Sequence, residues 1–423
     1  MGKTIWVVLG IALALILIVG GLFLYNSKST PNPIPNPINN NTINSLSVVH
    51  ANNQFAIDLY SKYKSKDGNL FYSPYSISSA LAMTYEGAKG QTAGEMKSVL
   101  HLPDNKETIR SDFVSINNEI NKEGKSYKLT SANALWVQKD YPFIKDYFDL
   151  VDNYYGGKAT NLDFKTDTEN SRITINKWVE DKTNDKIKNL IPEGILTPDT
   201  RLVLTNAIYF KANWSSQFYE ESTYDADFKI SNTNIVKIPT MHQTNELNYG
   251  ETDNLQILEM DYLGNDLSML IILPKDGDLN AVENSLDVSN FAEWKKDMGV
   301  EEVEVSIPRF KFETKYFMAD DLKEMGMPTA FNPDLADFSG MWNRQNDENL
   351  YISEVIHQAF VNVTESGTEA AAATAVVMMV GSAGPEPVIK PKIFKADHPF
   401  IFIIQQKDTG NILFMGRVSD PTK

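Results

Sequence analysis

Apolar residues follow helical or strand spacing through most of the chain after about residue 46. Spacings of three and four predict helices at residues 48–64, from Pro74 to Gly87, and at residues 169–191. Continuous or alternating apolar runs predict strands at residues 131–140, 200–214, 236–241, 267–274, 303–312 and 351–365, and a closing hairpin of 398–406 and 411–421. Helices come mainly early and strands mainly late, which is typical of an α+β fold with extensive sheet.

The N-terminal segment is apolar and is set apart from the rest. Lys3 precedes an uncharged stretch from Ile5 to Tyr25, long enough as a helix, at about 1.5 Å per residue, to cross a hydrocarbon core of roughly 30 Å. We expect residues 1–25 to be a single-pass transmembrane signal anchor with its N-terminus inside, which places the rest outside the cytoplasm. The alternative is a cleaved signal peptide and a secreted protein.

Residues 26–45 are rich in Asn and Pro and carry almost no charge. Such a stretch cannot bury a core, and its prolines keep it extended. The sequence therefore predicts a semi-rigid linker here and a folded domain at residues 46–423.

Composition excludes several classes of partner and site. The formal net charge of −16 argues against nucleic acid or an anionic membrane surface as the main partner, because both require clustered Lys and Arg. The absence of cysteine excludes disulfides, cysteine-ligated zinc and a thiol nucleophile.

No catalytic motif stands out either. The histidines do not form metal-spaced pairs; they are His50, His101, His242, His357 and His398. Gly-Ser-Ala-Gly at residues 381–384 lacks the spacing of a nucleophile elbow, and no glycine loop suits a phosphate. The sequence therefore predicts no enzyme activity, no cofactor and no metal site.

One segment has an ambiguous pattern. GTEAAAATAVVMMVGSAG, residues 367–384, holds one charge, Glu369; its first half favours helix and its second half favours strand. Its beginning resembles the hinge of inhibitory serpins. NLFYSPYSISSALAM, LTNAIYFKANW, SIPRF, ADFSGM, EVIHQAFVNVTESGTEAAAAT, ADHPFIFII and ILFMGRV also resemble serpin motifs and occur in serpin order. The chain is similar to prokaryotic serpins with an N-terminal signal anchor.

This resemblance implies the serpin fold, with a large central β-sheet, further sheets, about eight or nine helices and an exposed reactive loop. It further implies a monomeric suicide inhibitor that acts on serine proteases and on cysteine proteases. A protease cleaves the loop, the hinge at residues 367–380 inserts into the central sheet, and the acyl-enzyme is trapped. The alternative is a non-inhibitory serpin-fold binding protein.

The hinge suits insertion as a strand. With Thr368 facing inward, Glu369 falls on the outward face, so no charge is buried. Gly367 supplies a flexible turn, and the first proline after it is Pro385. The hinge residues implied by the resemblance are Glu365, Gly367, Thr368, Glu369, Ala370, Ala371, Ala372, Ala373 and Thr374.

The resemblance also implies the other working parts. Counted from Glu365, the seventeenth residue is Gly381, which places the reactive bond at Gly381–Ser382; Met378, Met379, Val380 and Ala383 remain alternatives. Small and medium apolar residues fit subtilisin-, elastase- or chymotrypsin-like proteases. A polar cluster beneath the sheet, the shutter, consists of Ser73, Ser76, Asn206 and His357, and the site where insertion starts, the breach, consists of Trp214, Arg309 and Glu365.

Overall fold

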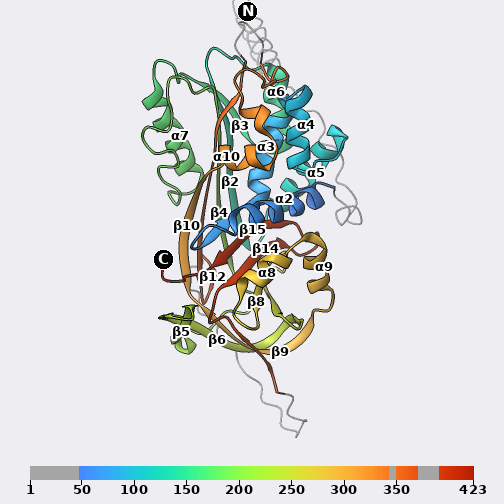
Figure 1. The fold of residues 1–423 in the computed structure, drawn as a ribbon, viewed down its shortest axis with the longest axis vertical. Helices are drawn as coiled ribbons and strands as arrows, with labels where there is room; N and C mark the ends of the chain where they lie inside the picture. Colours follow the sequence, from blue (N-terminus) through green and yellow to red (C-terminus); the bar gives the residue numbers. More distant parts are fainter. Residues whose placement is uncertain (1–46, 343–348, 370–389) are drawn as a thin grey trace, which may run out of the picture. The chain divides into compact units, whose positions relative to one another are not determined.

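Two β-sheets organise this computed structural model, which describes residues 47–342, 349–369 and 390–423 (Figure 1). The described residues belong to one structural unit, Asn40–Lys423. In spatial order, the six-stranded sheet consists of β10 (Phe310–Phe317), β11 (Ile352–Thr364), β12 (Gly367–Thr368), β4 (Leu202–Asn213), β2 (Tyr127–Gln138) and β3 (Lys158–Leu162).

The nine-stranded sheet is built mostly from the second half of the chain. Its order is β1 (Leu70–Tyr72), β15 (Ile412–Val418), β14 (Phe400–Gln406), β8 (Leu267–Pro274), β7 (Leu255–Asp261), β6 (Asn234–Glu251), β9 (Gly299–Pro308) and β13 (Lys392–Lys395), with β5 (Tyr224–Ser231) paired to β6. The predicted closing hairpin is present as β14 and β15.

Nine α-helices occur among the described residues. They are α2 (Ser47–Tyr63), α3 (Pro74–Gly87), α4 (Gly90–Val99), α5 (Lys106–Ile120), α6 (Lys145–Leu150), α7 (Thr168–Lys182), α8 (Leu279–Ser285), α9 (Val288–Lys296) and α10 (Ala319–Met325). Helix α3 is buried along its whole length; the Ser73 side chain caps its first turn and Pro74 begins it, an arrangement that suits proline because the first helical N–H needs no partner.

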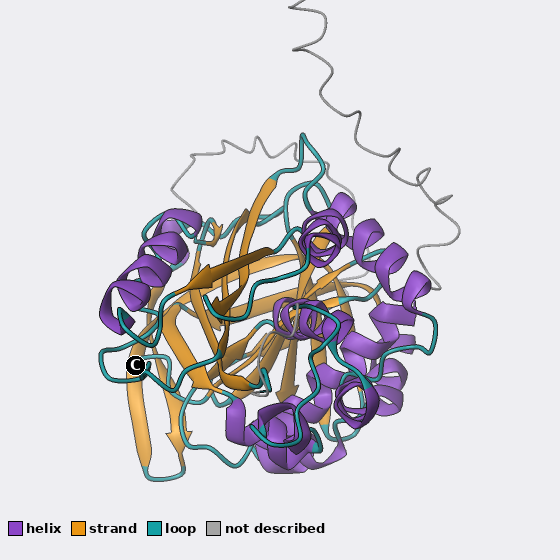
Figure 2. Cartoon of the chain, turned by 90° about the horizontal axis from the view of Figure 1, so that it is seen from above, coloured by secondary structure: helices purple, strands orange, loops and turns teal. Residues whose placement is uncertain are grey.

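Helices cover the six-stranded sheet on both faces. Helix α7 lies on one side of the strands, and α2 to α6 lie on the other (Figures 1 and 2). Side chains alternate accordingly: Leu135 and Val137 of β2 belong to the main core, whereas Trp136 between them packs in a second core beneath α7.

Two predicted elements end differently in the structure. The helix predicted at residues 169–191 stops at Lys182, because Asn184 and Asp185 adopt positive φ angles that a helix cannot contain. The strand predicted at residues 303–312 divides at Arg309 into β9 and β10, which belong to different sheets.

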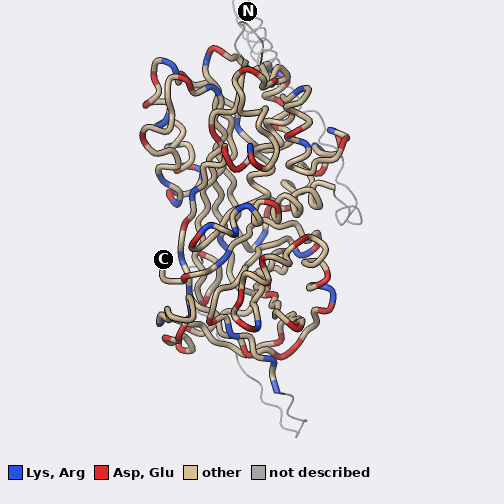
Figure 3. The backbone as a smooth tube through the Cα atoms, in the orientation of Figure 1, with Lys and Arg blue, Asp and Glu red and all other residues tan. Residues whose placement is uncertain are grey.

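Lys and Arg are interspersed with Asp and Glu along the described chain (Figure 3). None of the helices in the described ranges is long and apolar enough to span a bilayer. The predicted anchor (residues 1–25) and linker (residues 26–45) lie outside those ranges.

Candidate functional site

The start of the predicted hinge already occupies a place in the six-stranded sheet. Strand β12 lies between β11 and β4 and pairs antiparallel with both. Farther along, β11 and β4 pair directly with each other in parallel, with His357 beside Asn206. Gly367 and Thr368 therefore form a short inserted strand at the end of the sheet where β11 and β4 diverge.

Both residues of β12 fit this position closely. A Cβ on Gly367 would lie 2.1 Å from the Ala212 carbonyl oxygen, and its φ is +146°, so glycine is required there. Thr368 is buried, and its hydroxyl lies 2.7 Å from the Tyr262 hydroxyl. Thr368 thus faces the interior, on the side expected for an inserted strand.

Glu369 leaves the strand direction. Its φ of +47° belongs to the left-handed region, so the predicted alternation of facing ends at Thr368 in this structure. The carboxylate is largely buried and forms an ion pair with Lys186, which sequence reasoning missed. Burial and the neighbouring Glu369 charge raise the pKa of Tyr209 to about 12.

Trp214 fixes the backbone just before β12. Its indole Nε1–H donates to the Thr364 carbonyl at 3.0 Å, and its backbone N–H donates to the Ser366 carbonyl at 3.0 Å. The indole stacks on Tyr262 with a centroid separation of 4.5 Å. Tyr262 therefore links Trp214 to the inserted Thr368.

Arg309 and Glu365 are in contact. Arg309 Nε donates to the Glu365 carboxylate at 2.7 Å, and the Thr223 hydroxyl donates to the same oxygen. Burial alone raises the pKa of Glu365, but the bonds from Arg309 and Thr223 outweigh it and hold that pKa below its ordinary value. The carboxylate is thus charged at neutral pH.

The four predicted shutter residues lie together beneath the sheet. His357 of β11 is fully buried, and its Nε2 accepts the Ser73 backbone N–H at 3.1 Å. Nδ1 therefore carries the ring proton and donates it to the Asn206 side-chain oxygen. Burial lowers the pKa of His357 to about 3, so the ring is neutral at physiological pH.

The network continues from β4 to β2. The Asn206 amide donates to Ser76 Oγ at 2.5 Å and to the Asn133 side-chain oxygen, and Ser76 Oγ lies 2.9 Å from Ser131 Oγ. Sequence reasoning missed Asn133. The one sequence signal for this residue is that an Asn occurs within a predicted apolar strand. The cluster thus joins α3 to β11, β4 and β2, so moving β11 away from β4 breaks hydrogen bonds.

Known proteins are similar to this chain over most of its length. The family model described as "Serpin (serine protease inhibitor)" matches residues 50–421. The chain belongs to the serpin family. An uncharacterized serpin-like protein of Thermococcus kodakarensis is 46% identical over 375 residues, covering 88% of this chain and 86% of the relative.

Two further comparisons extend the family relation. The human leukocyte elastase inhibitor is 39% identical, with 88% of this serpin and 98% of the inhibitor covered. A crystal structure of a highly specific serpin of the insect Tenebrio molitor matches with a TM-score of 0.80 at 31% identity, covering 89% of this chain and 98% of that one. The predicted serpin fold is thereby confirmed.

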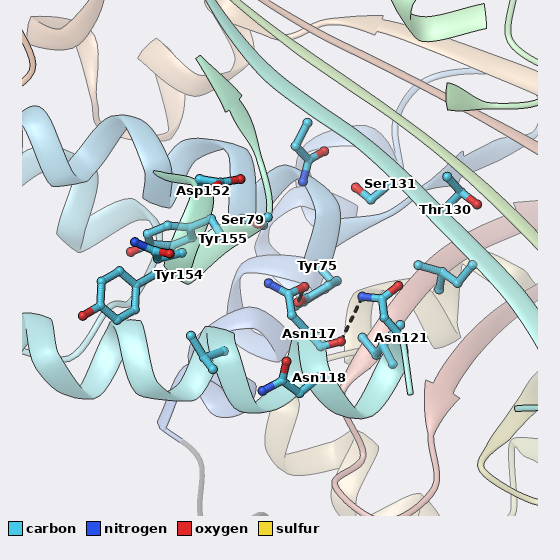
Figure 4. A pocket seen from close by; sticks show the side chains of 16 residues that line it. Tyr75, Ser79, Asn117, Asn118, Asn121, Thr130, Ser131, Asp152, Tyr154 and Tyr155 are labelled. Atoms are coloured by element: carbon cyan, nitrogen blue, oxygen red, sulfur yellow. Dashed lines mark hydrogen bonds between the residues drawn. The ribbon is translucent and has the colours of Figure 1, made fainter. Parts of the chain in front are cut away.

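A cavity of about 460 Å³ lies beside the shutter of this serpin (Figure 4). Ser131 and Asn133 line it, together with Tyr75, whose hydroxyl donates to Asn117 at 2.7 Å.

In the described part of the chain, no three His, Asp or Glu side chains gather as metal ligands. The hinge residues Ala370 to Thr374 and the reactive-bond candidates from Met378 to Ala383 lie outside that part.

Proposed function

We propose that this serpin is a suicide inhibitor of serine proteases, and also of cysteine proteases, that uses its own hinge as a strand. The observation that carries the proposal is the seating of Gly367 and Thr368 between β11 and β4. A glycine whose position leaves no room for a Cβ, followed by a buried threonine hydrogen-bonded to the Tyr262 hydroxyl, suits a hinge from which insertion continues.

The chemistry belongs to the protease. Its nucleophile attacks the scissile carbonyl of the loop and forms an acyl-enzyme. Insertion of residues 367–380 then moves the attached protease away from its docking position and distorts its oxyanion hole and catalytic residues. Deacylation needs those groups at fixed distances, so the adduct persists.

The inhibitor supplies stored free energy and a sheet that opens. Insertion beyond Thr368 replaces the direct pairing of β11 with β4 by pairing of each with the new strand. The bond between His357 and Asn206 must break in the same movement, because these residues stand on the two separating strands. The shutter therefore sets part of the barrier to insertion.

Sequence and family relations support the target class. Gly381–Ser382 is the proposed reactive bond, and the absence of Lys and Arg between Gly367 and Glu386 suits subtilisin-, elastase- or chymotrypsin-like pockets. The relation to a leukocyte elastase inhibitor supports this class. We place the inhibitor outside the cytoplasm, with residues 1–25 as its anchor, 26–45 as its linker and 46–423 as its serpin domain.

The test is to mix the full chain with subtilisin, elastase and trypsin and to separate the products on denaturing gels. With subtilisin, elastase or both, we expect an adduct that survives SDS. A C-terminal peptide should be released at the same time, and its mass should fix the cut near Gly381. Cleavage by both without any adduct favours the alternative, a non-inhibitory serpin-fold binding protein.

A further inference from the structure

The segment that follows α7 packs over the paired strands β4 and β11. We call residues 183–191 the covering segment. Its Ile187, Leu190 and Ile191 pack in the second core with Val203 of β4 and Ile356 of β11. Since these two strands separate during insertion, the covering segment has to lose or rearrange its contacts with at least one of them.

Lys186 connects this segment to the hinge. Its ammonium group pairs with the Glu369 carboxylate; the Lys186 side chain is 44% exposed and that of Glu369 is 10% exposed. The other carboxylate oxygen of Glu369 has no hydrogen-bond partner among the described residues. Lys186 is thus the cation that forms an ion pair with this largely buried carboxylate.

The pair exists only with the hinge in its present conformation. Glu369 turns away from β12 with φ +47°, and its N–H donates to the Asn362 carbonyl at 2.6 Å. Continued insertion requires Glu369 to become extended like the rest of a strand, which redirects its side chain. The ion pair therefore stabilises the resting hinge and not the inserted one.

We propose that Lys186 is a positioning residue for loop insertion: its ion pair with Glu369 stops the hinge at Thr368 and holds the covering segment on the sheet. This inference rests on the proposed function, since it concerns the rate of the insertion on which trapping depends. Without Lys186, the resting state keeps the Glu369 carboxylate largely buried with no ammonium group paired to it, and the uncleaved loop inserts sooner.

The test measures insertion of the uncleaved loop in the full chain, without relying on inhibition. Each protein is incubated at elevated temperature, and samples are exposed briefly to subtilisin. Gels report the fraction whose loop has become resistant to cleavage by insertion. The variants are Lys186→Met, which keeps the aliphatic stem, and Lys186→Met combined with Glu369→Gln. Lys188→Met is the matched control, because Lys188 is exposed in the same segment.

We expect Lys186→Met to become resistant about fivefold faster than the wild type, and the double variant to return within about twofold, because no unpaired charge remains. Lys188→Met should behave as the wild type. Equal rates for Lys186→Met and the wild type overturn the proposal, as does a double variant as fast as the single one. A loop that never becomes resistant in any variant also overturns it, whereas the SDS-adduct experiment decides the proposed function separately.

Discussion

His357 illustrates how much one buried side chain does in this fold. It satisfies the Ser73 backbone N–H and donates to Asn206, so it joins α3, β11 and β4 at one point. We predict that His357→Leu, which leaves both partners unpaired, lowers the free energy of unfolding by about 2–4 kcal/mol. Urea denaturation measures this. The exposed His50→Leu serves as the control and should change stability by less than about 0.5 kcal/mol.

Lowering the pH should reduce the contribution of His357 to the stability of the folded chain. The pKa of His357 is about 3 in the folded chain and about 6.5 for an ordinary histidine, so the unfolded chain binds the proton more readily. Its stabilising contribution is therefore complete above pH 6.5 and declines as the pH falls toward 3, by at most about 1.4 kcal/mol for each pH unit.

Urea midpoints at several pH values, compared between the wild type and His357→Leu, isolate this contribution, because other titrating groups are common to both. The wild type should lose more stability than the variant between pH 6.5 and 5. Parallel curves would show that His357 is not the neutral, buried group described here.

Strand β12 is the element from which insertion would continue. We predict that Thr368→Arg prevents productive insertion, because the arginine charge would have to occupy the buried position beside Tyr262. The variant should be cleaved by the target protease at an undiminished rate while forming at least tenfold less SDS-stable adduct. Asn232→Arg, at an exposed turn, should retain the adduct; retention by Thr368→Arg as well would contradict insertion through β12.

Local pattern predicted most elements, and the exceptions share a physical cause. The run at residues 169–191 has helical spacing to its end, but Ile187, Leu190 and Ile191 pack on two strands more distant in sequence, and the chain leaves the helix at Asn184 to reach them. The run at residues 303–312 alternates on both sides of Pro308, but β9 pairs with β6 and β10 pairs with β11, in different sheets. Such tertiary contacts override local preference.

The candidate site divides in the same way. Ser73, Ser76, Asn206 and His357 were identified through motifs, and the structure brings all of them together. Asn133 and Lys186 were missed because their importance comes only from spatial neighbours: a shared acceptor in one case and a buried carboxylate in the other. Residue type alone did not distinguish them from surface Asn and Lys.

In the molecule as a whole, the six-stranded sheet holds one strand position, that of β12, which only two residues fill. Two hinge residues are seated, and the strands beyond them pair with each other instead of with a continuing hinge. If residues 370–380 complete that strand after cleavage, each added backbone hydrogen bond contributes about 1 kcal/mol, and the hinge buries its alanines and valines as well. Cleavage should therefore stabilise the protein, which is the reverse of what a cut does to most folds.

The most direct test of this claim is the melting temperature of the full chain before and after the loop is cut near Gly381. We predict an increase of more than about 15 °C on cleavage, because a completed strand adds many kcal/mol to the stability of the folded state. An unchanged or lower melting temperature would mean that the hinge does not insert, and the proposed mechanism of inhibition would be wrong.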